Sequence, residues 1–143
     1  MIQKYMSKIS GPLKGRIDIH IEVLPVKYKE LSSEAGGEQS KFVSERVKTA
    51  RAKQHTRFEN YSTIFKNADM HTAEVRKFCA LDSAGAELLK MAMTKLGLSA
   101  RAYDRILKVS RTIADLENSE KILPQRISEA IQYRSLDRQP WKN

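Results

Sequence analysis

One short segment, residues 16–23, constrains the fold more than any other feature of this 143-residue chain. Its apolar members alternate with polar residues and are Ile17, Ile19, Ile21 and Val23. This period-two pattern predicts a β-strand with one buried face. No comparable second strand follows, and a lone strand has no partner for its backbone N–H and C=O groups. We therefore expect that the strand belongs to a sheet outside this sequence and that the chain is a fragment.

The composition predicts the boundaries between the domains of the chain. Residues 32–38 are rich in Ser, Gly and Glu, which is typical of a flexible linker. We expect a remnant of a core domain at residues 1–30, a linker at 31–40, a helical domain at 41–137 and a mobile tail at 138–143.

From residue 41 onward the pattern is helical, and the first helix is expected over residues 41–60. Ser, Thr and Asp favour the position before a helix, proline favours its first turn and glycine favours its end. The residues that carry these signals are Thr72, Asp82 or Ser83, Gly97, Ser99 and Pro124. The predicted fold class is all-α, a small bundle of about five helices preceded by the orphan strand.

Helical periodicity also assigns the buried faces. In the first helix the apolar positions near one face are Val43, Val47, Ala50 and Phe58. In the helix after Asp82 they are Ala84, Leu88, Met91 and Ala92. In the last helix Ile127, Ala130 and Ile131 are expected to point inward.

The net charge, the single cysteine and the three histidines limit the classes of function that the chain can have. The formal net charge is +9, which fits either an anionic partner or simple solubility. No apolar run is long enough to span a membrane. The single cysteine, Cys79, cannot form an internal disulfide, so a cytoplasmic location is expected. The spacings of His20, His55 and His71 match no zinc motif, so no metal site is expected.

Two groups of basic residues are candidates for binding anions. On the helix after Ser99, one basic stripe is formed by Arg101, Arg105, Lys108 and Arg111. Arg101 lies in the first turn, where free N–H groups favour a phosphate. The other reading of this stripe is a solvated face.

The second group lies on the first helix, where residues 41–57 include six Lys or Arg residues against one acidic residue. Such a helix could follow a nucleic-acid backbone. The candidate contacts are Arg46, Lys48, Arg51 and Lys53. Arg16 is a further candidate, because it stands at the start of the strand directly after a Gly-Pro turn, although a plain surface arginine is the alternative.

The sequence contains no GxxxxGK[ST] motif and no GxGxxG motif. It therefore has no phosphate-cradling loop of its own. We do not expect this chain to hydrolyse a nucleotide alone or to hold one tightly.

These segments together resemble a known family. The similarity runs through the blocks at residues 5–13, 16–23, 67–70, 96–116 and 130–134. They are similar to the end of the core and the following domain of ComM/YifB-type magnesium-chelatase-like AAA+ ATPases. One departure stands before Arg16, where Leu13-Lys14-Gly15 replaces the usual Leu-Leu-Asp.

The resemblance implies that the chain is the C-terminal helical lid of a hexameric ATPase. Arg16 then matches an arginine finger that reaches the ATP of the neighbouring subunit. Arg101 matches the sensor-2 arginine on the γ-phosphate, with Arg105 as a further candidate phosphate contact. ATP and Mg²⁺ would bind the parent protein, and the partners would be its own core, neighbouring subunits of a homo-hexamer and DNA.

Three functions stay open from the sequence. ComM-like members imply a motor that remodels DNA by branch migration. The alternatives are an interaction module of a true magnesium chelatase subunit and a stand-alone basic helical module that binds DNA.

Overall fold

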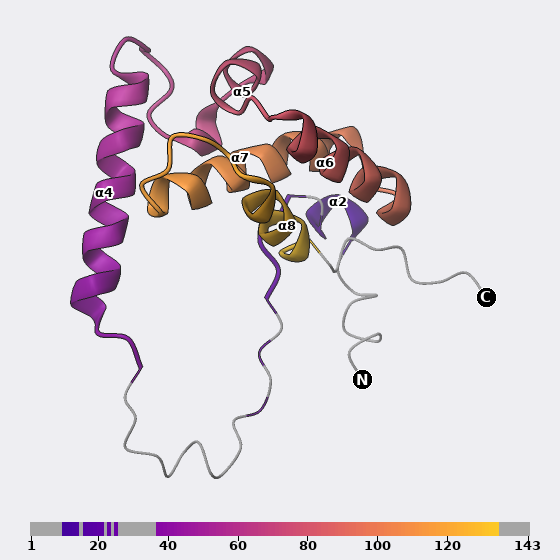
Figure 1. The fold of residues 1–143 in the computed structure, drawn as a ribbon, viewed down its shortest axis with the longest axis horizontal. Helices are drawn as coiled ribbons and strands as arrows, with labels where there is room; N and C mark the ends of the chain where they lie inside the picture. The colour runs from indigo at the N-terminus through magenta and orange to yellow at the C-terminus, as the bar shows by residue number, and fades with distance from the viewer. Residues whose placement is uncertain (1–9, 15, 22, 24, 26–36, 135–143) are drawn as a thin grey trace.

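The computed structural model describes the whole chain except residues 1–9, 15, 22, 24, 26–36 and 135–143. Within these described residues, all regular secondary structure is helical (Figure 1). The predicted all-α fold class is therefore confirmed. Most of the expected linker and the whole expected tail lie outside the described residues.

Seven helical elements occur in the described part of the chain. They are α2 (Gly11–Lys14), α4 (Ser40–Phe58), the 3₁₀ turn η1 (Asn67–Asp69), α5 (Thr72–Phe78), α6 (Ser83–Leu96), α7 (Ala100–Leu116) and α8 (Pro124–Gln132). Helix α7 runs through the centre, α4 stands along one side, and α8 lies against α7 (Figure 1).

The helix boundaries follow the local signals. Asp82 accepts a hydrogen bond from the Gly85 N–H at 2.7 Å and caps α6. Gly97 ends α6 in the left-handed conformation, with φ 61°. Ser99 caps α7, and Pro124 is the first residue of α8. Thr72 is the first helical residue of α5, and the residue before the helix is His71, whose N–H donates to the Glu74 carboxylate.

Helix α7 supplies more buried apolar residues to the core than any other described element. Its buried apolar residues are Ala102, Ile106, Leu107, Ile113 and Ala114. They pack against residues of α5, α6 and α8 such as Val75, Leu89 and Ile127, each at most 3% exposed. At one side, the rings of Phe58, Tyr61 and Phe78 meet edge to face.

The buried face of α6 differs from the predicted one. Met91 is 44% exposed, whereas Gly85 and Leu89 are buried. Gly85 faces α8, because a Cβ built on it would lie 2.7 Å from Ile127 Cδ1. Periodicity therefore found the helix but placed its face about one position away, because the closest approach to α8 occurs at a glycine.

Helix α4 is buried at only one end. Ala50 and Phe58 are in the core, but Val43 and Val47 are 39% and 42% exposed. The first half of the helix extends away from the bundle (Figure 1). The prediction of four residues on one buried face is therefore wrong for the first two.

The predicted strand is also not formed. Residues 16–21 and 23 adopt no strand, and Ile17, Ile19, Ile21 and Val23 are 42–85% exposed. The physical reason is that no other described residue offers a strand edge to pair with. The Gly-Pro segment before the predicted strand is not an open turn. It forms the short helix α2, which contains Pro12.

Candidate functional site

Helix α7 presents Arg101 at its first turn. Ser99 fixes this end of the helix, since its Oγ accepts a hydrogen bond from the Ala102 N–H at 3.3 Å. Arg101 is the second residue of α7 and is exposed. A guanidinium in this position stands beside free backbone N–H groups, an arrangement that suits a phosphate.

A cavity opens next to this end of α7. Its volume is about 730 Å³, and it lies between α5, α6 and α7. Its walls include Ala100, Tyr103 and Asp104 from the first two turns of α7. Tyr103 is 43% exposed at this opening.

Arg105 lies one turn beyond Arg101 and contacts the segment that contains Arg16. Its Nη1 donates to the carbonyl oxygen of Arg16 at 2.9 Å and also forms an ion pair with Asp18. The Arg105 side chain is 29% exposed. In this structure its guanidinium is therefore directed at the 16–18 backbone.

The same segment contacts the end of α8. The His20 N–H donates to the carbonyl oxygen of Tyr133 at 2.7 Å. Arg134, a buried residue, donates from Nη1 to the carbonyl oxygen of Ile17 at 3.1 Å. The Arg16 side chain itself is exposed. The predicted finger residue therefore projects from a backbone that α7 and α8 hold.

The predicted basic stripe divides into outward and inward members. Lys108 donates to the carbonyl oxygen of Ala68 at 3.0 Å. Arg111 is only 4% exposed and is part of the core. The stripe as predicted is therefore wrong at Arg111, because a guanidinium can be buried where carboxylate and carbonyl oxygens accept all its hydrogen bonds.

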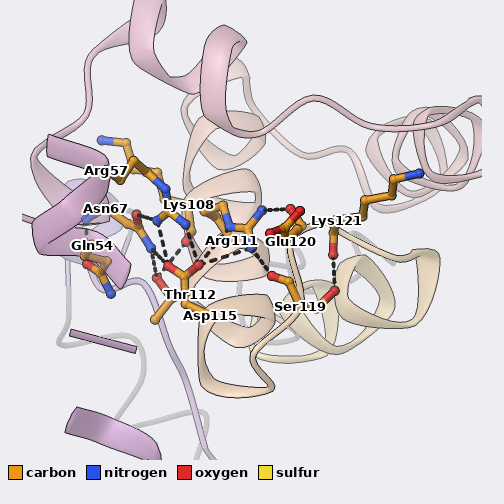
Figure 2. A network of polar contacts seen from close by, with 10 residues as sticks. All are labelled: Gln54, Arg57, Asn67, Lys108, Arg111, Thr112, Asp115, Ser119, Glu120 and Lys121. Atoms are coloured by element: carbon orange, nitrogen blue, oxygen red, sulfur yellow. Dashed lines mark hydrogen bonds and ion pairs between the residues drawn. The ribbon is translucent and has the colours of Figure 1, made fainter. Parts of the chain in front are cut away.

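Asp115 is the centre of a buried polar network (Figure 2). Arg57 donates to Asp115 Oδ2 at 2.7 Å and to Oδ1 at 2.6 Å. Asn67 donates to Oδ2 at 2.8 Å, and Arg111 donates to Oδ1 at 3.2 Å. The network joins α4, η1 and α7.

Two further contacts extend the network to the next loop. Arg111 Nη1 donates to the carbonyl oxygen of Glu120, and Nη2 donates to that of Ser119, each at 2.6 Å. Asn67 also donates to the hydroxyl of Thr112 at 3.0 Å. No sequence motif predicted this network. The i, i+4 spacing of Arg111 and Asp115 was the one local signal for it.

The pKa values in this network follow from burial and charge. Burial by itself would raise the pKa of Asp115, but the hydrogen bonds from Arg57 and Asn67 outweigh it, and the pKa is lowered. For Arg111, burial is the largest influence and lowers its pKa, although Asp115 opposes that shift. The network is thus a compact charged centre of two cations around one carboxylate.

The basic face of α4 is partly neutralised. Arg46 pairs with Glu38, with Nη2 2.8 Å from Oε2, and Lys48 lies 3.3 Å from the Glu45 carboxylate. The hydrogen bond from Arg46 lowers the pKa of Glu38. Arg51 is exposed and Lys53 is half-buried. These four predicted nucleic-acid contacts remain a prediction, while Arg57 on the same helix points inward to Asp115.

Neither metal-binding nor membrane features emerge from the described ranges. No three His, Cys, Asp or Glu residues among them are grouped so that they could hold a metal ion. No helix there is long and apolar enough to cross a membrane. Cys79 is buried, and burial raises its pKa to about 11.

Two family models match this chain. Residues 37–134 match the model described as magnesium chelatase, subunit ChlI C-terminal. Residues 1–31 match the model described as magnesium chelatase, subunit ChlI.

Individual relatives cover nearly the whole chain. The uncharacterized protein YifB of Escherichia coli is 39% identical over 136 residues, which is 94% of this chain and 26% of YifB. The competence protein ComM of Haemophilus influenzae is 40% identical over 138 residues, 96% of this chain and 26% of ComM. An uncharacterized protein of Mycobacterium tuberculosis, Rv2897c, is 30% identical over 134 residues, 92% of this chain and 26% of its own length. The chain thus spans about a quarter of the length of the curated relatives it matches.

Proposed function

The chain belongs to the family of the magnesium chelatase ChlI C-terminal domain, as its resemblance to ComM and YifB indicated, and on that premise we propose that it is the sensor-2 lid of an AAA+ ATPase. The observation that carries this proposal is the placement of Arg101. This exposed arginine stands on the capped first turn of the central helix, where a phosphate is favoured.

In this proposal Arg101 contacts the γ-phosphate of ATP. A guanidinium can donate two hydrogen bonds to phosphate oxygens and stabilises the charge that grows on them during transfer. The opposite end of α7 is tied to α4, because Arg57 donates two hydrogen bonds to Asp115. ATP and Mg²⁺ would be held mainly by a P-loop core, because this sequence has no P-loop motif.

Arg16 acts in this proposal as an arginine finger for the next subunit of a ring. Its side chain is exposed, and its backbone is held by Arg105. A finger supplied in trans contributes about 10³–10⁵ to the rate of phosphoryl transfer. Six copies in a closed ring would give every ATP one finger from a neighbour.

The proposal can be tested by measuring ATP hydrolysis in the protein that contains both a P-loop core and this chain. Arg101→Ala and Arg16→Ala should each lower the maximal rate at least about tenfold, whereas Lys90→Ala, which removes an exposed cation of α6 that belongs to neither site, serves as the control. A rate unchanged by both Arg101→Ala and Arg16→Ala would refute the lid assignment. Gel filtration with ATP would show whether the assembly is a hexamer.

For the substrate of this motor we propose DNA. The chain has a formal net charge of +9, and one matched relative carries the name competence protein. The basic face of α4 extends from the bundle and contains the exposed residues Arg46, Lys48 and Arg51. Phosphate contacts of this kind give affinity that falls steeply with salt.

DNA binding by the chain can be measured by fluorescence anisotropy between about 50 and 200 mM salt. The variant Arg51→Gln with Lys53→Gln should flatten the salt dependence, and Lys121→Gln, an exposed lysine far from α4 in the sequence, is the control. Tight binding that survives high salt and prefers one sequence would instead favour a stand-alone DNA-binding module. Co-purification with a porphyrin-binding subunit, without DNA binding, would favour the chelatase interaction module.

A further inference from the structure

We propose that Arg105 is a positioning residue that ties the segment of Arg16 to helix α7, so that α7 and Arg16 move together. This inference rests on the proposed function, because it assigns a shared motion to the two arginines that would serve ATP. In it, one helix carries both the phosphate contact and the attachment of the finger.

The contacts show how the tie is built. Arg105 reaches two acceptors at once, the Arg16 carbonyl oxygen at 2.9 Å and the Asp18 carboxylate. One guanidinium that spans a carbonyl and a carboxylate fixes both the position and the direction of the backbone between them. An isolated surface ion pair would do this poorly, because it contributes little on its own.

Two hydrogen bonds from the end of α8 reinforce the tie. Ile17 accepts from Arg134 at 3.1 Å, and His20 donates to Tyr133 at 2.7 Å. The backbone groups of residues 16–20 have no strand partner in the described part of the chain. The helices therefore satisfy several polar groups that a sheet would otherwise satisfy.

The spacing on α7 links the two arginines. Arg101 and Arg105 are four residues apart, so they lie on nearly the same side of the helix, separated by about 6 Å along its axis. A rotation of α7 that follows contact between Arg101 and a phosphate would displace Arg105 as well. Through Arg105, the displacement reaches the backbone of Arg16.

The first arm of the test uses the chain itself and needs no ATPase activity. Arg105→Ala should speed hydrogen exchange of the His20 amide about tenfold, with unchanged helical circular dichroism. The matched control is Arg126→Ala, because Arg126 forms an ion pair with Glu117 and is 28% exposed, against 29% for Arg105. Exchange that is the same in Arg105→Ala and Arg126→Ala would overturn the tie.

The second arm measures ATP hydrolysis by the protein that also carries the P-loop core. A positioning role predicts a lower kcat for Arg105→Ala with KM nearly unchanged, and partial recovery in Arg105→Lys, which keeps the charge near Asp18 without the planar guanidinium. A raised KM with full kcat would overturn the inference and make Arg105 a direct contact to ATP.

The outcomes separate this inference from the proposed function. If Arg16→Ala and Arg101→Ala lower the rate but Arg105→Ala does not, the lid assignment stands and the positioning role is refuted. If none of the three lowers the rate, the lid assignment is refuted, and with it the role of the tie in hydrolysis.

Discussion

Arg57 donates two parallel hydrogen bonds to Asp115, 2.7 Å to Oδ2 and 2.6 Å to Oδ1, and so joins the last turn of α4 to the last turn of α7. The Asp115 side chain is fully buried and that of Arg57 is 14% exposed. A bidentate pair of this kind holds both helices in one geometry. The two helices are far apart in the sequence, so this contact depends on the tertiary fold.

Replacement of Asp115 by asparagine should destabilise the domain by about 3–5 kcal/mol. The substitution leaves the buried cations of Arg57 and Arg111 without a counter-charge. Urea unfolding followed by circular dichroism measures the effect. Glu117→Gln, which removes the carboxylate of a partly exposed pair with Arg126, is the control and should cost clearly less than Asp115→Asn. Equal losses in both variants would contradict this view of the network.

The Asp115 carboxylate should also make the free energy of unfolding depend on pH in the acid range. The pKa of Asp115 is lower in the folded chain than its usual value, so its contribution is present above the unfolded pKa of about 3.9 and is lost as pH falls through the folded pKa. The difference in free energy of unfolding between wild type and Asp115→Asn should therefore be constant near neutral pH and narrow below about pH 4. A difference that stays constant down to pH 2 would contradict the lowered pKa.

Cys79 should be unreactive while the domain is folded. Burial is the main cause that raises its pKa to about 11, so only about a thousandth of the thiol is ionised at pH 8. Reaction with a thiol reagent at pH 8 should be slow in buffer and fast in concentrated urea. Rapid labelling of the folded chain, with circular dichroism unchanged, would show that the thiol is accessible.

Gly85→Ala should destabilise the packing of α6 on α8 by about 1–3 kcal/mol. The added Cβ would lie 2.7 Å from Ile127 Cδ1 and 3.1 Å from Asp82 Oδ1. Ile127→Val removes the first of these atoms, so the double variant should lose less stability than the two single losses combined. Gly37→Ala, where a Cβ meets no atom within 4 Å, is the matched control and should have little effect.

Local chemistry explains what could be predicted from the sequence. The caps at Asp82 and Ser99, the glycine end at Gly97 and the proline start at Pro124 each act within a few residues, so each is readable without the fold. The family blocks placed Arg16 and Arg101 as candidates, and both are exposed.

Long-range contacts explain what could not be predicted. Periodicity assigned Arg111 to an outward stripe, because a charge on a helix is usually solvated, but acceptors from Asp115 and from the next loop make its burial favourable. The contact between Arg105 and Asp18 joins residues 87 positions apart, and no local pattern records it. The face of α6 was misplaced because Gly85 has no apolar side chain to count.

Arg111 fixes the angle between α7 and α8. Its hydrogen bonds to the carbonyl oxygens of Ser119 and Glu120 fasten the bend between α7 and α8 from inside. Because the bend is fixed in this way, α7 and α8 are expected to move together as one rigid body. We therefore expect that a displacement of the first turn of α7, beside Arg101, would also shift the chain just after α8, where Arg134 donates to Ile17.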